Sequence, residues 1–275
     1  YQIDKVIKFE GIKKGIENTN YFLKTNKKKF ILTIFEKRVN KKDLPFFMNL
    51  MDKLYQKRII CPKPLKNKKG KYLSTIKGKS ACIVNFIEGK DKAHLDYKNC
   101  FDVGKNIAKF HKATSKIALY RENSMSIKKL GGLLRSIEFK SKKKMLDLKS
   151  TLNKNLRDIK REWPKNLPKG IIHGDLFIDN IFFDKNKFSG FIDFYFSSND
   201  YLMYEIAICI NALCFDKIQN KFVMNNKKIK NLINGYESVK FLSKKEKNSL
   251  NVLCRGAALR YLLTRIYDYF NTPKT

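Results

Sequence analysis

The chain has 275 residues, of which 43% are hydrophobic, enough for one large domain or two lobes around a substantial core. No apolar run approaches the ~18 residues of a membrane span and no charged-then-apolar leader follows Tyr1, so we expect neither a membrane segment nor a secretory signal. The net charge of +34 would suit nucleic acid or anionic lipid, but only 9 of the 59 basic residues are Arg, and the lysines are scattered. We interpret this charge as a compositional bias and expect no specific nucleic-acid binding, although the positive field would still attract a nucleotide.

The first third of the chain has the alternation of a β-sheet. Residues 20–25 and 29–36 are rich in β-formers around a short polar turn, which predicts a hairpin. Residues 71–76 and 80–86 predict two further strands. The Glu88-Gly89 step ends this region, so we expect an N-terminal nucleotide-binding lobe over 1–87 and a C-terminal catalytic and substrate-binding lobe over 88–275.

Helical periodicity begins within the first lobe and dominates the second. Asp43 precedes a periodic apolar segment with Pro45 near its start, which predicts a helix that Asp43 caps. Further helices are expected at 101–111, 128–161, 201–215, 227–240, 244–254 and 255–270. We therefore predict an α+β, bilobal protein-kinase-like fold with a small antiparallel β-rich N-lobe and a larger, mostly helical C-lobe.

The segment 171–194 contains the most specific motif. His173, Asp175 and Asn180 form an H-x-D-x-x-x-x-N pattern, and Asp193 follows a predicted hairpin that turns at Lys185-Asn186. An isolated D-x-x-x-x-N is usually an acidic surface loop between strands. The addition of the His and of a second Asp after a hairpin indicates the catalytic loop and metal-binding strand of a phosphotransferase.

Each residue of this motif has an expected role. A carboxylate in the loop can take the proton of a substrate hydroxyl, so Asp175 is our candidate catalytic base. The oxygen atoms of Asn180 and Asp193 suit Mg²⁺, which binds one or two carboxylates together with phosphates. We place His173 in the catalytic set as well, where bracing the loop is favoured over proton transfer.

The nucleotide site is predicted around the first strands. Gly11 and Gly15 would let the backbone approach phosphate, and Asn18, Thr19 and Asn20 would supply small polar contacts. On its own, a pair of glycines before a strand usually marks an ordinary turn.

The connection between the lobes, residues 84–89, would offer backbone groups to adenine. Asn85 and Ile87 are its candidate contacts.

Several longer segments carry a family resemblance. GIENTNYFL, FILTIFEKR, DLPFFMNLMDKL, IIHGDLFIDNIFF, GFIDFYFSSNDYLMYEIAICINALCF and AALRYLLTRIYDYFNTP, in this order, resemble the homoserine kinase family of the aminoglycoside-phosphotransferase-like superfamily. The resemblance implies ATP-dependent phosphorylation of the L-homoserine hydroxyl to O-phospho-L-homoserine, a step of threonine biosynthesis. It also implies that Asp175 is the base and that Asn180 and Asp193 bind Mg²⁺.

The chain departs from the superfamily pattern in three places. Thr33 stands where many of these kinases have a phosphate-binding Lys on the third strand, and we include Thr33 among the nucleotide contacts. Glu205 replaces an Asp in the helix after Asp193, where we expect it to brace the loop. The family continues beyond Asn271-Thr-Pro, so we expect the chain to be a fragment.

The substrate amino acid needs a cation for its carboxylate and acceptors for its ammonium. The candidates are Tyr195, Asn199, Asp200, Arg260 and Arg265. Both arginines stand among apolar residues, an unfavourable environment unless they are paired. An internal salt bridge of Arg260 to Glu205 or Asp268 is an equally good interpretation.

Other functions remain open from the residues alone. Another amino alcohol or sugar, such as choline, ethanolamine or an aminoglycoside, could be the acceptor, although choline would require an aromatic cage and an aminoglycoside an acidic cleft. A catalytically inactive kinase-like binding protein is the alternative from a different class. The six cysteines show no metal-binding spacing, which indicates reduced thiols and a cytoplasmic protein; the oligomeric state is not indicated.

Overall fold

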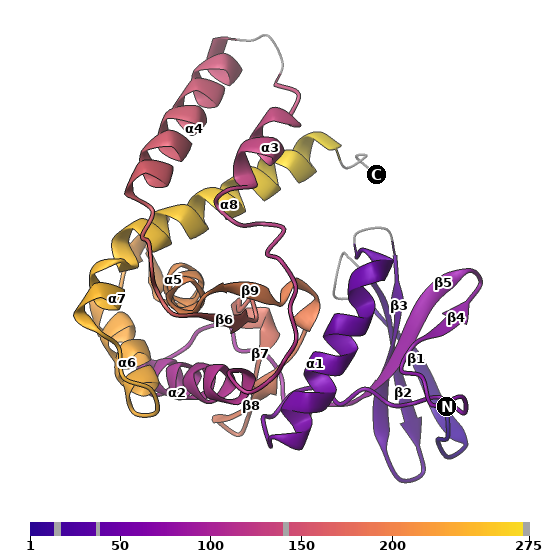
Figure 1. Ribbon diagram of the computed structural model, residues 1–275. Helices are drawn as coiled ribbons and strands as arrows, with labels where there is room; N and C mark the ends of the chain where they lie inside the picture. The colour runs from indigo at the N-terminus through magenta and orange to yellow at the C-terminus, as the bar shows by residue number, and fades with distance from the viewer. Residues whose placement is uncertain (14–17, 37–38, 140–142, 272–275) are drawn as a thin grey trace.

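The N-lobe of the computed structural model is an antiparallel sheet flanked by one long helix (Figure 1). The structure describes residues 1–13, 18–36, 39–139 and 143–271. The sheet has the order β1-β2-β3-β5-β4, with strands β1 (Val6–Ile12), β2 (Asn18–Thr25), β3 (Lys29–Phe35), β4 (Ser74–Ile76) and β5 (Lys79–Asn85). The four predicted strands are confirmed, and β1, whose residues are all exposed, was not predicted.

Helix α1 (Leu44–Gln56) lies between the sheet and the C-lobe (Figure 1). Its apolar residues recur with helical spacing, so one face can be buried against the sheet residues Phe35, Cys82 and Val84. The helix is confirmed, but the predicted cap is wrong. The Asp43 side chain makes no capping bond, because its Oδ2 atom accepts a hydrogen bond from Arg121 Nε at 2.7 Å.

The connection between the lobes lies on the hairpin of the catalytic segment. Lys90 and Phe183 exchange backbone hydrogen bonds of 3.0 and 2.9 Å. Gly89 has φ +106°, and a Cβ atom there would lie 2.6 Å from the Phe183 carbonyl oxygen, so only glycine allows this approach. The Ser189 hydroxyl donates to the Glu88 carbonyl oxygen. The place where the N-terminal sheet ends is therefore held directly by the segment that leads to Asp193.

Two clusters of helices form the C-lobe. The central helices are α2 (Tyr97–Thr114), α5 (Leu202–Leu213), α6 (Asn226–Glu237) and α8 (Leu250–Asn271), with the short α7 (Lys244–Asn248) before α8. Helices α3 (Leu130–Arg135) and α4 (Lys143–Glu162) pack along α8 around a separate apolar core, and α4 projects from the lobe (Figure 1). None of the described helices is long and apolar enough to cross a membrane.

Two glycines set the distance between α2 and α6. A Cβ atom on Gly104 would lie 1.9 Å from the Leu232 carbonyl oxygen, and one on Gly235 would lie 2.0 Å from the Phe101 carbonyl oxygen. These contacts require the two backbones to touch, so neither position can hold a side chain without separating the helices.

The described part of the C-lobe also contains three short antiparallel pairs of strands. They are β6 (Lys169–Ile172) with β9 (Ser198–Tyr201), β7 (Ile181–Asp184) with β8 (Lys187–Phe191), and β10 (Phe215–Ile218) with β11 (Lys221–Met224). The β7–β8 hairpin is confirmed, and its turn residues Lys185 and Asn186 both have positive φ. The other two pairs were not predicted, and the predicted helix break near residue 254 is wrong because α8 continues through it.

Candidate active site

The catalytic loop begins where β6 ends. Gly174 has φ +79°, and a Cβ atom there would lie 2.9 Å from the Phe196 carbonyl oxygen. The loop can therefore turn against the segment after Asp193 only with glycine at this position. As a result, Asp175 leaves the strand beside the segment that follows Asp193.

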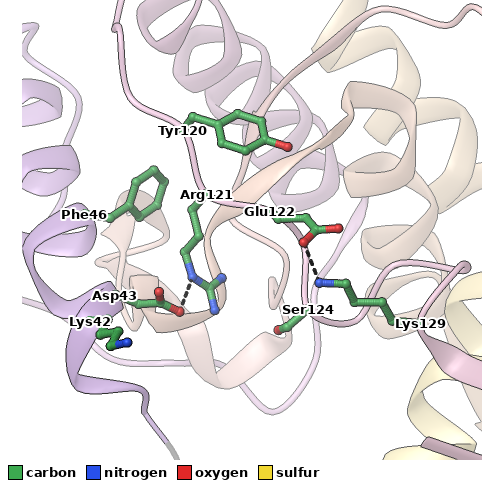
Figure 2. A pocket seen from close by; sticks show the side chains of 8 residues that line it. All are labelled: Lys42, Asp43, Phe46, Tyr120, Arg121, Glu122, Ser124 and Lys129. Carbon is green, nitrogen blue, oxygen red and sulfur yellow. Dashed lines mark hydrogen bonds and ion pairs between the residues drawn. The ribbon is translucent and has the colours of Figure 1, made fainter. Parts of the chain in front are cut away.

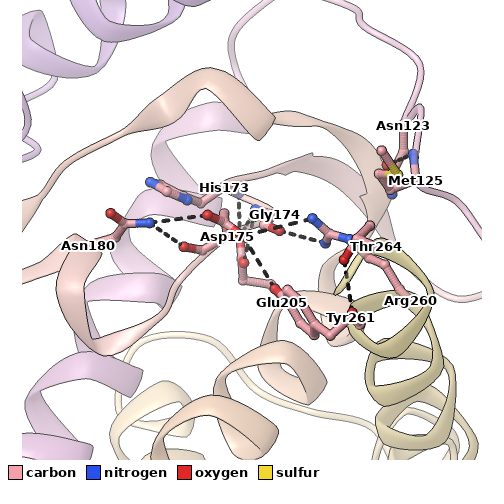
Figure 3. Close-up of polar contacts among 10 residues, drawn as sticks. All are labelled: Asn123, Met125, His173, Gly174, Asp175, Asn180, Glu205, Arg260, Tyr261 and Thr264. Carbon is pink, nitrogen blue, oxygen red and sulfur yellow. Dashed lines mark hydrogen bonds and ion pairs between the residues drawn. The ribbon is translucent and has the colours of Figure 1, made fainter. Parts of the chain in front are cut away.

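The Asp175 carboxylate lies between an amide on one side and the last helix on the other (Figure 3). Asn180 Nδ2 donates to the backbone carbonyl oxygen of Asp175 at 2.8 Å and to the Asp175 carboxylate oxygen Oδ2 at 3.3 Å. On the other side, Tyr261 OH lies 3.5 Å from Asp175 Oδ1, and Arg260 Nη2 lies 3.9 Å from the same atom. The carboxylate is thus held in one orientation next to a positive charge, and it remains partly exposed.

His173 is fully buried beneath the loop. Its Nε2 atom lies 2.9 Å from the Ile192 carbonyl oxygen, and since a carbonyl only accepts, the ring proton is on Nε2. Burial lowers the pKa of His173 to about 4, so the ring is neutral near pH 7. This geometry ties the catalytic loop to the residue before Asp193 and keeps the imidazole away from any substrate.

Glu205 supports the same loop from α5. Its carboxylate accepts hydrogen bonds from the backbone N–H groups of His173 and Gly174, the latter at 3.1 and 3.3 Å. The side chain is completely buried, and burial raises its pKa to about 7 although the two N–H groups and Arg260 act in the opposite direction. Glu205 stands where the resemblance implies an Asp, and its longer side chain reaches the backbone of the loop directly.

Arg260 lies under the loop rather than in an open substrate pocket. It is 3% exposed, and its Nη1 atom donates to the Gly174 carbonyl oxygen at 2.6 Å. The guanidinium also lies over the rings of Phe196 and Tyr261, 5.7 and 4.9 Å from their centroids. The structure therefore corrects the predicted substrate contact and favours the internal alternative, with Gly174 and Asp175 as its partners.

Asp193 occupies a strained backbone position at the other end of the site. It has φ 62° and ψ 64°, in the left-handed region that few non-glycine residues adopt, and it directly precedes the turn Phe194–Phe196. The neighbouring Ile192 N–H donates to the Asn180 carbonyl oxygen at 3.0 Å. Asn180 and the Asp193 segment are thus adjacent, as the motif predicts.

The residues present fit a magnesium ion that arrives with a nucleotide. Because Asn180 Nδ2 donates to Asp175, its amide oxygen is directed away from that carboxylate, and Mg²⁺ prefers such oxygen ligands. Among the described residues no group of three His, Cys, Asp or Glu could hold a metal by itself. One carboxylate and one amide therefore need phosphate oxygens to complete the site.

The predicted nucleotide residues of the N-lobe lie in β2 and β3. Asn18, Thr19 and Asn20 form the start of β2 rather than a loop, and Gly15 lies outside the described residues. Thr19 Oγ1 donates to Glu36 at 2.9 Å, and Asn18 Oδ1 accepts from the Glu36 N–H at 3.4 Å. The buried Thr33 donates to Asn20 Oδ1 at 2.7 Å, so it serves the sheet and replaces no lysine charge.

The two candidate adenine contacts differ. Asn85 exchanges hydrogen bonds with Lys63: its N–H donates to the Lys63 carbonyl at 3.0 Å, and its side chain accepts from the Lys63 N–H. These bonds occupy the N–H group and the side-chain oxygen of Asn85, which are therefore not available to adenine. Ile87 lies in the lobe connection beyond the end of β5, and it stays a prediction.

Two of the predicted substrate residues face elsewhere. The Tyr195 ring packs edge-on against Phe35 and Phe47 of the N-lobe, at 5.0 and 5.7 Å between centroids. Burial raises the pKa of the Tyr195 hydroxyl well above its ordinary value. Arg265 is exposed, and five residues along a helix place it about 140° around the axis from Arg260. Neither position agrees with a shared substrate site.

Asn199 and Asp200 remain near the site with defined partners. Asn199 exchanges hydrogen bonds with the Arg121 backbone, at 2.9 Å through its side chain and 2.7 Å through its N–H. Asp200 accepts from Asn123 Nδ2 at 2.6 Å and from the Tyr201 N–H at 2.7 Å. Burial raises the pKa of Asp200, while the nearby Arg260 charge acts in the opposite direction.

Sequence reasoning missed two site residues. The Tyr261 ring packs edge-on against Phe177 of the loop, with 4.4 Å between the ring centroids. Tyr261 directly follows Arg260, and a tyrosine next to an arginine among apolar residues was an available signal in the sequence. Arg121 contacts Asp43, Ser197 and Phe47. Arginine is rare in this chain, with 9 residues among 59 basic ones, and this rarity was only a weak signal. The residues that Arg121 contacts lie far away in the sequence, so the sequence did not indicate them.

Comparison with known proteins agrees with this geometry. Residues 8–242 match the family described as the phosphotransferase enzyme family. The chain belongs to this family. As a phosphotransferase it is an enzyme, and the homoserine kinase of Rhizobium meliloti (strain 1021) is 41% identical over 273 residues, covering 99% of this chain and 83% of that protein. The resemblance seen in the sequence is confirmed.

Solved structures of small-molecule kinases share the fold of this phosphotransferase. A microcompartment-associated aminopropanol kinase has a TM-score of 0.77 at 13% identity, covering 100% of this chain and 87% of that one. Amicoumacin kinase in complex with AMP-PNP, Ca²⁺ and its ligand has a TM-score of 0.74 at 14% identity, covering 97% and 83%. The predicted α+β bilobal protein-kinase-like fold is confirmed.

Proposed function

We propose that this phosphotransferase is a cytoplasmic homoserine kinase, which transfers the γ-phosphoryl group of ATP to the hydroxyl of L-homoserine and releases ADP and O-phospho-L-homoserine. The observation that carries the proposal is the convergence of the Asp175 carboxylate, the Asn180 amide and the Asp193 segment in one place. The 41% identity to homoserine kinases along almost the whole chain supports the choice of acceptor.

Asp175 is the catalytic base in this proposal. Its Oδ2 atom is held by Asn180, and Arg260 near Oδ1 favours the ionised carboxylate, which is the form that accepts a proton. The homoserine hydroxyl donates a hydrogen bond to Asp175, passes its proton to that carboxylate as the O–P bond forms, and the bond to the ADP oxygen breaks.

Asn180 and Asp193 are the proposed ligands of Mg²⁺, through the amide oxygen and the carboxylate. Bound there with the nucleotide, the ion would offset the negative charge of the phosphates. His173 positions Asp193 through the Ile192 carbonyl, and Glu205 positions Asp175 through the Gly174 N–H. These two buried groups therefore hold the backbone beside each proposed functional carboxylate.

ATP is proposed to bind between an N-terminal lobe over residues 1–87 and a C-terminal lobe over 88–275. Ile87 in the lobe connection would face adenine, and Gly15, which precedes β2 in the sequence, is proposed to contact the phosphates. Because Thr33 carries no charge, the scattered lysines and the metal site supply the positive field in this proposal.

For homoserine, Asp200 remains our candidate acceptor for the ammonium. Its carboxylate already has two donors, Asn123 and the Tyr201 N–H, which fix its orientation. Asn199 lies beside it on β9 and would set the position of the pocket wall.

An acceptor panel tests the function. The protein is mixed with MgATP and, separately, L-homoserine, choline, ethanolamine, aminopropanol or kanamycin, while ADP release and the phosphorylated product are measured. We expect O-phospho-L-homoserine to form with the highest kcat/KM and in equal amounts with ADP. A higher kcat/KM for another acceptor, or ADP release that no acceptor stimulates, contradicts the proposal.

A further inference from the structure

Arg121 joins the start of α1 in the N-lobe to the segment that follows Asp193. Its Nε atom donates to Asp43 Oδ2 at 2.7 Å, and its Nη1 atom donates to the Ser197 carbonyl oxygen at 3.0 Å. The guanidinium also lies over the ring of Phe47 in α1, 5.0 Å from the centroid. One side chain thus contacts two segments from different parts of the fold.

The backbone of Arg121 is held as firmly as its side chain. Arg121 and Asn199 exchange two hydrogen bonds, 2.9 Å to the Asn199 side chain and 2.7 Å from its N–H. Asn199 belongs to β9, which begins directly after Ser197. The arginine is therefore anchored in the C-lobe, and its guanidinium is the part that reaches the N-lobe.

The segment between Asp193 and Ser197 is in contact with the N-lobe through a second side chain. Tyr195 packs edge-on against Phe47, the same ring that the Arg121 guanidinium covers. A movement of α1 would therefore act on this segment at Tyr195 and at Ser197 together. Asp193, whose backbone is already in the left-handed region, stands at the start of the same segment.

Apolar packing does not close this junction on its solvent side. A cavity of about 360 Å³ opens between the first turn of α1 and residues 120–129, and the Arg121–Asp43 pair lies against it (Figure 2). Lys129 also lines this cavity, but it pairs with Glu122 of the same segment and reaches no part of α1. Polar contacts therefore span the gap at this point.

An isolated ion pair on the surface would contribute little. The Arg121 and Asp43 side chains are 14% and 30% exposed, and the guanidinium has a carbonyl and an aromatic ring as further partners. Partly buried charges with such geometry are screened much less by solvent and salt.

We propose that Arg121 is a positioning residue that couples the placement of the N-lobe to the geometry of the metal-binding segment, so that Mg-nucleotide binds well only when the Arg121–Asp43 pair is formed. This inference rests on the proposed kinase function, because it assigns the metal-nucleotide to Asn180 and Asp193.

Nucleotide binding tests the proposal without any acceptor. Calorimetry measures the Kd of ADP with Mg²⁺ and with EDTA for the wild type, Arg121→Gln, Asp43→Asn, the double variant and Lys129→Gln. We expect each of the first two substitutions to weaken MgADP binding about tenfold, which corresponds to about 1.4 kcal/mol of binding free energy. The EDTA affinities should change by less than about twofold, and the double variant should be no weaker than Arg121→Gln because both remove one contact.

Lys129→Gln is the matched control, since it removes one positive charge from the same cavity. Its MgADP affinity should equal that of the wild type; an equal loss would mean that general charge, rather than the bridge between the lobes, attracts the nucleotide, and would overturn the proposal. Unchanged MgADP affinity in folded Arg121→Gln and Asp43→Asn would overturn it as well. If Arg121→Gln fails to fold, Asp43→Asn decides alone, because it leaves the Ser197 contact in place.

The kinetic readout separates this inference from the proposed function. In the homoserine assay the Arg121→Gln variant should raise the KM for MgATP about tenfold and leave the KM for homoserine within about twofold. A wild-type protein that phosphorylates no homoserine contradicts the function, and the calorimetry still decides the role of Arg121.

Discussion

The catalytic loop of the C-lobe and the first strands of the N-lobe are built in opposite ways. Beneath the loop, His173, Glu205 and Arg260 are each at most 3% exposed and hold its backbone and that of Ile192 through hydrogen bonds. In the N-lobe every residue of β1 is exposed, and Thr19 contacts Glu36, whose other partner Lys79 is half exposed. The loop in the C-lobe is thus held by buried contacts, whereas the first strands of the N-lobe also depend on contacts between exposed side chains.

This difference follows from what each half must do. A base has to be held within tenths of an ångström, which buried and paired charges achieve. A nucleotide carries its own charges and a metal, so the strands around it can adapt when it binds. We therefore expect substitutions at the loop to change the rate and the stability strongly, and substitutions in the first strands to act weakly.

The largest expected effect is the loss of the base. Asp175→Asn keeps the shape of the side chain but removes the proton acceptor, so kcat should fall by about 10³-fold, within the range known for general-base catalysis. Asp179→Asn, an exposed carboxylate in the same loop, should leave kcat within about twofold. Steady-state kinetics with homoserine measures both, and a comparable loss in the two variants would contradict the assignment of the base.

The second prediction concerns pH, because two buried groups under the loop titrate in opposite directions. The pKa of Glu205 is raised from 4.5 to about 7, so the folded state holds its proton more tightly and stability rises as the pH falls from 7 to 4.5. The pKa of His173 is lowered from 6.5 to about 4, so stability falls as the pH falls from 6.5 towards 4. Each contributes about 1.4 kcal/mol per pH unit, and between pH 4.5 and 6.5 they nearly cancel.

Glu205→Gln removes one side of this balance. The free energy of unfolding of the variant should fall by about 1.4 kcal/mol per pH unit on acidification from pH 6.5 to 4.5, relative to the wild type. Urea unfolding at three pH values measures the slope. Parallel pH profiles for the two proteins would show that the carboxylate does not hold a proton in the folded state.

The third prediction tests the rigidity of the frame that carries the loop. Gly104→Ala places a methyl group 1.9 Å from the Leu232 carbonyl oxygen and should force α2 and α6 apart, with a loss of about 1–3 kcal/mol of stability. In Gly132→Ala the methyl group meets nothing within 4 Å, and the gain in helix propensity should stabilise by about 0.5–1 kcal/mol. Thermal unfolding of the pair gives shifts of Tm with opposite signs if the contact is as described.

The smallest effect is expected in the N-lobe. Thr33→Val removes a hydroxyl that donates to Asn20 Oδ1, so stability should fall by about 0.5–1.5 kcal/mol, the usual contribution of one hydrogen bond. The KM for ATP should rise no more than about threefold, because that bond joins two strands rather than protein and nucleotide. A tenfold rise in the KM for ATP would contradict the weak role expected of the first strands and would indicate that Thr33 contacts the phosphates directly.

Much of the fold and part of the site could be predicted from the sequence. The strands β2, β3 and β5, the helix α1 and the β7–β8 hairpin were expected at nearly their observed positions, since they depend on local alternation and turn residues. Strand β1 and the pairs β6–β9 and β10–β11 were missed because they are short or fully exposed. Their pairing depends on partners that local periodicity does not indicate.

The sequence by itself determined the set of groups that we propose to take part in the reaction. Asp175, Asn180 and Asp193 are separated by a short turn and a hairpin, so their spacing alone brings them together. Only the tertiary structure decided what surrounds these groups. Arg260 contacts the Gly174 carbonyl oxygen from 86 residues away, and the Tyr195 ring packs against the N-lobe. Arg121 contacts both lobes. The physical reason is burial, because whether a charged side chain binds substrate, supports a loop or joins two lobes depends on which distant residues exclude water from it.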